Sequence, residues 1–276
     1  MAKSRFLIIS AVLAVLNACS PSFKPFKFIH MSDTQIGFID TSEGYSHSDS
    51  LFRAAAAQAN AENPDLFFIT GDLVDNTSDP LQNAVFEAGV ATLDAPVWLV
   101  PGNHDYNKTW TEDIRDSYVA LRGYERFSFV HERCAFIGID SNCVMEDAPE
   151  AEAAQKEWLI KELAKARKCR HTFIFLHCPI FRNSVDEPHD YSNFPVEKRR
   201  EYLSLFKEHG VTAIFAGHTH ADYHFTFEGI DHVIANPVAN ALGHGSPGFN
   251  VITVKEDGIE VKSVQTQGFD PDKCRF

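Results

Sequence analysis

Five short polar clusters in this 276-residue chain carry side chains of the kinds that bind divalent metals. Each cluster directly follows an apolar run with the length of a buried strand. In chain order the clusters are Asp33-Thr34-Gln35, Gly71-Asp72-Leu73-Val74-Asp75, Gly102-Asn103-His104-Asp105, His177-Cys178-Pro179 and Gly217-His218-Thr219-His220. Carboxylate, amide and imidazole groups without thiolate suit Mn²⁺, Fe²⁺, Zn²⁺ or Mg²⁺. The sequence therefore predicts metal chemistry.

The elements that position these clusters read as an α/β pattern in the first half of the chain. Apolar runs alternate there with helical patterns, an order that favours right-handed crossovers onto a parallel sheet. The expected strands are 26–31, 65–70 and 97–100, and the expected helices are 47–60 and 81–93. The carboxyl ends of parallel strands share one edge, where ligands bind, so the clusters should converge.

Local geometry supports this convergence. Side chains two residues apart in an extended segment point to the same side, so the pairs Asp33/Gln35 and His218/His220 should each face one site. Glycines 71, 102 and 217 are expected to let the backbone turn sharply after each strand.

The second half of the chain predicts a hairpin, two long helices and then only short strands. The expected strands are 127–130, 135–139, 172–176, 212–216, 223–227, 232–235, 250–254 and 259–264, with helices at 151–167 and 197–209. No internal repeat or linker is evident. We expect one domain over residues 26–276 of class α/β (α+β in part), with two packed mixed β-sheets flanked by helices.

The ordered set of clusters is similar to the calcineurin-like metallophosphoesterase superfamily, whose fold is an αββα sandwich. The resemblance runs from Phe26 to about Val264. Three further segments resemble the subgroup described as calcineurin-like phosphoesterase domain-containing protein, which includes Ser/Thr protein phosphatases. These segments are Trp158-Leu159, His177-Cys178-Pro179-Ile180-Phe181 and the acidic stretch from Asp186 to Tyr191.

The resemblance implies two divalent metal ions. Asp33, Gln35 and His220 would bind the first ion, and Asp72 would bridge both ions. Asn103, His177 and His218 would bind the second ion. The superfamily usually has histidine where Gln35 stands. A neutral carbonyl is a poorer zinc ligand, which favours Mn²⁺ over Zn²⁺; alternatively, Gln35 only holds a metal-bound water.

The implied reaction is hydrolysis of a phosphate ester. Two ions would lower the pKa of a shared water, whose hydroxide attacks phosphorus. His104 would protonate the leaving group, oriented by Asp105 or another carboxylate, while Asp75 would hold a ligand loop in place. Arg182, in the loop after His177, is the first candidate for a phosphate contact.

Three functions are compatible with these residues. The first is hydrolysis of phosphomonoesters, with phosphoserine and phosphothreonine in proteins as one substrate class. The second is a phosphodiesterase or nucleotide pyrophosphatase, and the third is a surface lipoprotein with a binding role. The net charge of −13 argues against nucleic acid, which such a surface repels, whereas metal ions can reverse the local field for a small ester or a phosphoprotein.

The N-terminus has the features of a targeting segment. Lys3 and Arg5 precede an apolar run over 6–16 that is too short to span a bilayer. Residues 16–19 (Leu-Asn-Ala-Cys) resemble a bacterial lipobox, which predicts a signal peptide over 1–18, lipidation of Cys19 and a tether over 19–25. The protein would then be exported and membrane-anchored in the periplasm or at the cell surface, with a charge of −15 once Lys3 and Arg5 are removed. An ordinary secretory signal peptide is the alternative.

The five other cysteines are odd in number and lack the close spacing of a zinc site. We expect buried thiols in the main. A single disulfide would suit an oxidising compartment, but the sequence does not assign one.

Overall fold

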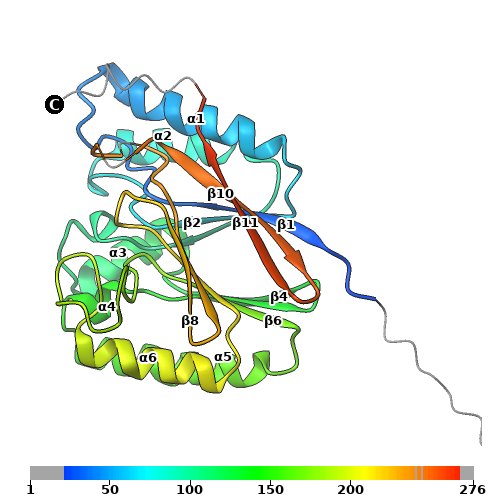
Figure 1. Cartoon of the computed structure of the whole chain (residues 1–276). Coiled ribbons are helices and arrows are strands. Elements are labelled where there is room, and N and C mark those ends of the chain that lie inside the picture. The colour runs from blue at the N-terminus through cyan, green and yellow to red at the C-terminus, as the bar shows by residue number, and fades with distance from the viewer. Residues whose placement is uncertain (1–21, 240, 244, 268–276) are drawn as a thin grey trace, which may run out of the picture.

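A computed structural model describes residues 22–239, 241–243 and 245–267, which form two β-sheets packed between helices (Figure 1). The predicted α/β class with two mixed sheets is confirmed. The predicted signal peptide, Cys19 and Cys274 lie outside the described residues. No helix in the described part of the chain is long and apolar enough to cross a membrane.

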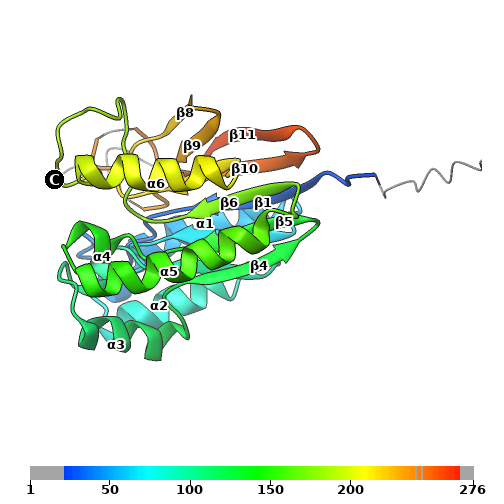
Figure 2. The same ribbon diagram turned by 90° about the horizontal axis from the view of Figure 1, so that it is seen from below.

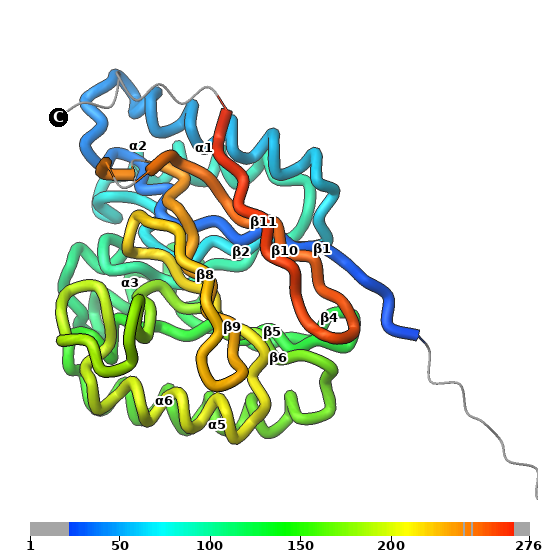
Figure 3. Tube along the Cα trace, viewed as in Figure 1, coloured from blue at the N-terminus to red at the C-terminus, as the bar shows by residue number. Residues whose placement is uncertain are grey.

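The first sheet has the strand order β11-β10-β1-β2-β3. Strands β1, β2 and β3 run parallel, and β10 pairs antiparallel with β1. The strands are β1 (Phe26–Met31), β2 (Leu66–Thr70), β3 (Val97–Val100), β10 (Gly248–Lys255) and β11 (Gly258–Gln265). The trace shows the C-terminal hairpin returning to lie beside the first strand (Figure 3).

The second sheet has the order β4-β5-β6-β7-β9-β8. Its four central strands are parallel, and β4 and β8 close the edges antiparallel. The strands are β4 (Phe127–His131), β5 (Cys134–Gly138), β6 (His171–Phe175), β7 (Ala213–Ala216), β8 (Tyr223–Phe227) and β9 (Ile230–Ile234). The predicted hairpin is therefore β4–β5.

Helices cover the outer faces of both sheets. In the two views α1 and α2 lie on one side of the sandwich, and α5 and α6 lie on the other (Figure 2). The longer helices are α1 (Ser46–Asn60), α2 (Pro80–Val90), α3 (Glu112–Arg122), α5 (Pro149–Ala166) and α6 (Val196–Glu208). Short turns of helix are η1 (Glu43–Tyr45), η2 (His104–Tyr106) and α4 (Asn142–Met145).

Three apolar clusters correspond to the three interfaces of these four layers. Between the sheets, phenylalanines dominate, and the rings of Phe68 and Phe175 stack with centroids 3.9 Å apart. Ile29 of β1 packs with α1 and α2, and Ile174 of β6 packs with α5 and α6. Neighbouring residues of one strand point to opposite faces, so both faces of these central strands are buried. This explains why the strands appear as continuous apolar runs.

The main difference from the sequence-based expectation is a helix. The helix α3 was not predicted, although its signals are present: Thr111 accepts a hydrogen bond from the Ile114 amide, and Gly123 follows the helix at φ +91°. The described cysteines, Cys134, Cys143, Cys169 and Cys178, are all free thiols. The disulfide that the sequence left open is therefore absent among them.

Candidate metal centre

The polar clusters meet where the carboxyl ends of both sheets come together. In the clusters after β1, β2, β6 and β7, the first candidate ligand stands two positions beyond the end of the strand. These four residues are Asp33, Asp72, His177 and His218. Asn103 stands three positions beyond the end of β3. The first sheet supplies three clusters and the second supplies two, so the site lies across the sandwich. The predicted convergence of distant segments is present.

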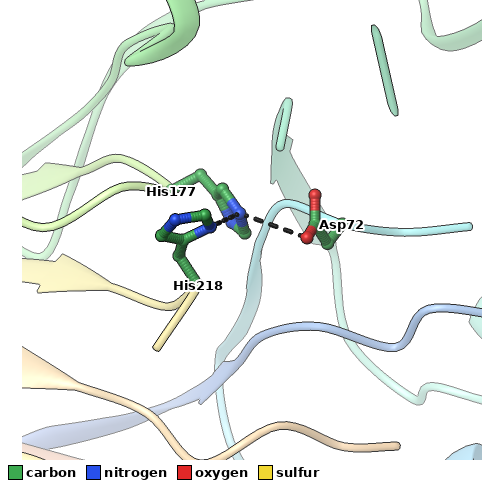
Figure 4. A group of neighbouring side chains, drawn as sticks. All are labelled: Asp72, His177 and His218. Carbon is green, nitrogen blue, oxygen red and sulfur yellow. Dashed lines mark hydrogen bonds and ion pairs between the residues drawn. The ribbon is translucent and has the colours of Figure 1, made fainter. Parts of the chain in front are cut away.

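Asp72, His177 and His218 form the tightest group (Figure 4). The Nε2 atom of His177 lies 3.4 Å from Asp72 Oδ2 and 3.1 Å from His218 Nδ1. The Asn103 Oδ1 atom lies 3.2 Å from the same Nε2. All three residues of the group are buried, and their ligand atoms lie within 4.8 Å of one another. The four side chains therefore converge as expected for the second metal.

Asp33, Gln35 and His220 form a second group next to Asp72. His220 Nε2 is 3.6 Å from Asp33 Oδ1, and the Gln35 amide nitrogen donates to Asp72 Oδ2 at 3.2 Å. Asp33 Oδ1 and Gln35 Oε1 are buried oxygens without a hydrogen-bond partner. Buried acceptors are costly unless something satisfies them, and a cation is one way to do so. The donor set thus fits a first metal with oxygen-rich ligation.

The backbone of this centre is strained in a recurring way. Five of the predicted ligands have φ between +35° and +69°, a region that side chains other than glycine seldom adopt. They are Asp33, Gln35, Asp72, His218 and His220. The members of each pair two residues apart therefore converge through left-handed turns and not through extended chain. Such strain persists only where the surroundings impose it, and it concentrates at functional sites.

The predicted glycines allow neighbouring loops to approach each other closely, and this role matters more than sharp turning of the backbone. A Cβ on Gly102 would lie 2.2 Å from Asp72 N and Oδ1, and one on Gly217 would lie 1.6 Å from Ser32 Oγ. Only Gly71 among the three predicted glycines has a positive φ, of +82°. The expected role as sharp turns is thus wrong for Gly102 and Gly217, which instead let neighbouring ligand loops pack against each other.

The two carboxylates near His104, Asp75 and Asp105, make different kinds of contact. The Nδ1 atom of His104 lies 2.7 Å from Asp75 Oδ1, so Asp75 is the carboxylate that orients the ring. Asp105 instead accepts hydrogen bonds from the Gly102 and Leu73 amides, at 2.8 and 3.1 Å. The prediction allowed Asp105 or another carboxylate to orient His104: Asp105 does not contact the ring, and Asp75 is the other carboxylate. The His104 amide also donates to Asp72 Oδ1 at 2.8 Å.

Burial and charge set the ionisation of the centre. Burial opposes the charged forms of Asp72 and His177, but their attraction outweighs it: the pKa of Asp72 falls below its usual value and the pKa of His177 rises to about 9. Burial and the charge on His177 lower the pKa of His218 to about 4. The charge of the buried Asp72 carboxylate is thus balanced by protonated His177. A divalent ion bound at this place would replace that proton.

Further from the centre, burial raises the pKa of Asp105 to about 7, and the charge on Asp72 adds to the rise. For His104, burial lowers the pKa, but the hydrogen bond to Asp75 and the charges of Asp72 and Asp75 together outweigh burial, so the net pKa is raised. The edge of the Phe38 ring covers His104, with centroids 5.3 Å apart. His104 therefore has a charged partner and an apolar neighbour, a setting that suits a proton donor.

Two loop residues after His177 have different environments. Arg182 pairs with Asp190 and Glu187 of its own loop and lines a hollow of about 520 Å³ beside β8. Its expected contact with a phosphate stays a prediction. Tyr191 instead contacts both Asn103 and His218. The sequence analysis names Tyr191 only as the end of the acidic stretch after His177, because no motif or spacing ties it to Asn103 or His218.

The two-sheet sandwich and this buried donor set define a metal-dependent phosphoric ester hydrolase. The chain belongs to the calcineurin-like phosphoesterase family, whose model matches residues 26–222.

Relatives and solved structures agree with this placement. The chain is 30% identical over 261 residues to the serine/threonine-protein phosphatase CPPED1 of Bos taurus, a match that covers 85% of this chain and 82% of the relative. The human protein of the same name is 29% identical over 257 residues, with the same coverage. The crystal structure of a dimetal phosphatase from Danio rerio shares the fold, with a TM-score of 0.65 at 16% identity over 88% of this chain and 99% of that chain.

Proposed function

We propose that the protein is a binuclear metal-dependent phosphomonoesterase. The observation that carries the proposal is the convergence of seven metal-ligand side chains from both sheets, with His104 held by Asp75 at their border. When bound, two divalent ions supply a nucleophile by lowering the pKa of water, and they neutralise the phosphate oxygens. Asp33, Gln35 and His220 would hold the first ion and Asn103, His177 and His218 the second, with Asp72 between them.

The chain's own residues supply the remaining chemistry. His104, oriented by Asp75, donates a proton to the leaving oxygen, and such a donor contributes roughly 10²–10⁴-fold to the rate. Asp105 keeps the loops that carry Asp72 and Asn103 in register by accepting the Leu73 and Gly102 amides. The side chain that would transfer the proton is therefore different from the side chains that would bind the metals.

Gln35 supports a preference for manganese at the first site. Its Oε1 is a neutral oxygen that lies buried without a hydrogen-bond partner. An oxygen ligand in place of imidazole favours harder ions. We therefore expect Mn²⁺ to activate the protein better than Zn²⁺.

For the substrate, we propose phosphoserine or phosphothreonine in a polypeptide. The support is the match to relatives named serine/threonine-protein phosphatase, which covers 85% of this chain. The rival substrates are small phosphomonoesters and phosphodiesters, which the same donor set can accommodate.

One experiment tests the class and narrows the substrate. The purified chain is assayed with p-nitrophenyl phosphate, bis(p-nitrophenyl) phosphate and a phosphoserine peptide, with Mn²⁺, Zn²⁺, Fe²⁺ or Mg²⁺ in turn. We expect metal-dependent turnover that the Asp72→Asn and His104→Ala variants lose, with the monoester and the peptide favoured over the diester. Faster hydrolysis of the diester would assign a phosphodiesterase. Metal uptake without any turnover would reject the enzyme and point to a binding role.

We also propose that the protein is an exported lipoprotein anchored through Cys19. The support is the basic and apolar pattern of residues 1–18 and the cysteine that follows it. The test is the mass of the protein from bacterial membranes: an acylated Cys19 at the N-terminus is expected, and a Cys19→Ser variant should leave the membrane fraction. A mature protein that begins at another residue without acylation would refute the anchor.

A further inference from the structure

Tyr191 touches two of the proposed second-metal ligands with its two ends. Its hydroxyl oxygen accepts a hydrogen bond from Asn103 Nδ2 at 2.7 Å. Its backbone carbonyl accepts one from His218 Nε2 at 2.9 Å, and its ring lies over the His218 ring with centroids 4.6 Å apart. The residue is nevertheless 64% exposed, so a core role does not explain its position.

The contact with Asn103 holds the amide side chain in place beside the centre. An amide offers an oxygen acceptor at one end and an N–H₂ donor at the other, and only the oxygen can bind a metal. In the structure Oδ1 faces His177 Nε2 at 3.2 Å, while Nδ2 is directed to the Tyr191 hydroxyl. A rotated amide would place its N–H₂ group in the centre and turn its oxygen to the Tyr191 hydroxyl, which can donate as well as accept. The hydroxyl therefore anchors the outer end of the Asn103 side chain, which holds the inner end of the amide at the centre.

The contact with His218 decides the tautomer of that ring. A neutral imidazole carries one N–H, and the other nitrogen has the lone pair that binds metal. With Nε2 donating to the Tyr191 carbonyl, the lone pair of His218 sits on Nδ1, which faces His177. His177 is oriented in the same way by a different group, since its Nδ1 donates to the Thr70 carbonyl at 2.7 Å.

The loop that carries Tyr191 is held by hydrogen bonds to its own side chains and to a side chain of α6. The fully buried guanidinium of Arg199 donates to the backbone carbonyls of Phe194, Val185 and Glu187. The Glu187 carboxylate accepts the backbone amides of three residues at the start of the loop, namely 182, 183 and 184. These bonds hold the loop on α6, so it presents Tyr191 in one position without help from a ligand.

We propose that Tyr191 is a positioning residue for the second metal, which it serves by anchoring Asn103 through its hydroxyl and orienting His218 through its carbonyl. This inference rests on the proposed two-metal centre. Groups that orient metal ligands typically change metal affinity about 10–100-fold when they are removed. The hydroxyl can be removed alone, because Tyr191→Phe keeps the ring and the backbone carbonyl.

The test is calorimetric titration of the full chain with Mn²⁺, which reads binding without turnover. Tyr191→Phe should weaken one of two sites about 10–100-fold and leave the other unchanged. Tyr124→Phe is the matched control, since the Tyr124 hydroxyl accepts the Leu99 amide and contacts no proposed ligand. In this control both affinities should equal those of the wild type.

A second background separates this anchoring from general stability. In the Asn103→Ala protein the Tyr191 hydroxyl has no amide to anchor. There Tyr191→Phe should cost less than about threefold, well below the 10–100-fold expected with Asn103. Equal losses in the two backgrounds, or no loss with Asn103, would overturn the inference.

The titration also keeps this inference apart from the proposed function. A wild-type protein that binds a single Mn²⁺ would reject the binuclear proposal. The role of Tyr191 would then be supported if Tyr191→Phe weakened that single ion, and rejected if it did not. Two wild-type sites that are both insensitive to Tyr191→Phe would reject the inference and leave the binuclear centre standing.

Discussion

His104, the proposed proton donor, makes contacts through both its main chain and its ring. The His104 amide donates to Asp72 Oδ1, and its ring pairs with Asp75 through Nδ1. The same residue is therefore tied to the proposed bridging carboxylate by its backbone and aimed by a separate carboxylate. With Nδ1 engaged, Nε2 is the atom that can serve a leaving oxygen.

This arrangement predicts how His104→Ala depends on the leaving group. An alkoxide needs a proton as it departs, whereas p-nitrophenolate leaves readily without one. We expect the variant to lose about 10²–10⁴-fold in kcat/KM on a phosphoserine peptide and clearly less on p-nitrophenyl phosphate. Asp75→Asn should show the same direction with a smaller loss. Equal losses on both substrates would indicate that His104 does not donate a proton.

At the residue scale, the sequence predicted the convergence of the polar clusters better than the contacts of single carboxylates. The candidate ligands could be named because metal chemistry restricts their types and the strand ends restrict their places. The partner of His104 could not be read, because Asp105 follows it in the single turn of η2 and points elsewhere. Asp75, which is 29 residues away in sequence, reaches the ring instead. Side-chain direction in short turns depends on backbone angles that the sequence pattern does not give.

At the scale of elements, the close packing of ligand loops makes Gly102 sensitive for a steric reason. A Cβ there would overlap Asp72 N and Oδ1 at 2.2 Å. We expect Gly102→Ala to lower the free energy of unfolding by about 1–3 kcal/mol and to weaken Mn²⁺ binding, measured by urea unfolding and calorimetry.

A control variant isolates backbone strain from this overlap. Gly229 has φ +84°, and a Cβ there would have no atom within 4 Å. Gly229→Ala should therefore cost about 1 kcal/mol in the free energy of unfolding and leave Mn²⁺ affinity unchanged. Unchanged Mn²⁺ affinity in Gly102→Ala would contradict the close approach seen between the β2 and β3 loops.

The buried histidine of β9 predicts a pH dependence of stability. His232 stacks on Phe225 with centroids 4.8 Å apart, and burial lowers its pKa from 6.5 to about 4. The folded state keeps His232 neutral below pH 6.5, where the unfolded state binds a proton. Stability should therefore fall as the pH drops from 6.5 towards 4, by up to about 3 kcal/mol from this group.

The measurement is the free energy of unfolding of wild type and His232→Phe at several pH values. The variant keeps an aromatic ring and removes the titration, so the difference between the two proteins should grow as the pH falls below 6.5 and stay constant above it. Parallel curves over pH 4–8 would show that His232 contributes nothing to acid sensitivity.

At this scale the predicted strands and helices were largely confirmed, since buried parallel strands and amphipathic helices leave strong periodic patterns. The helix α3 was missed because only Tyr118 is buried in it, so its apolar stripe is weak. Its capping residues, Thr111 and Gly123, were the better signal. The left-handed φ values at the ligands could not be read from residue type, since carboxylates and histidines adopt them only under external constraint.

At the scale of the whole molecule, the pattern of apolar residues in the sequence could not predict the order of the strands in the two sheets. Residues such as Phe28 and Phe68 alternate with others that face the helices, but periodicity does not say which sheet a strand joins. The C-terminal strand β10 pairs with β1, more than two hundred residues away in sequence. The order of the expected elements carried the expectation of two packed sheets, and the family resemblance implied the same sandwich, but neither gave the order of the strands.

Because the proposed ligands come from both sheets, we expect metal binding to stabilise the whole fold. Asp33, Asp72 and Asn103 follow strands of the first sheet, and His177 and His218 follow strands of the second. A metal bound by the folded state alone at 100 times its Kd contributes about 2.7 kcal/mol per site. For a domain of this size, 1 kcal/mol corresponds to roughly 2–4 °C in Tm, so one saturated site should raise Tm by about 5–10 °C.

The measurement is thermal unfolding of wild type and Asp72→Asn, each with Mn²⁺ and with excess EDTA. The wild type should lose its extra stability on chelation, whereas the variant, which lacks the proposed bridging carboxylate, should respond little. Asp65→Asn is a suitable control, because Asp65 lies at the opposite end of β2. An Asp72→Asn protein with the full response to Mn²⁺ would place the stabilising ion elsewhere. A wild type indifferent to chelation would mean that the two sheets hold together without the metals, which would then act in catalysis alone.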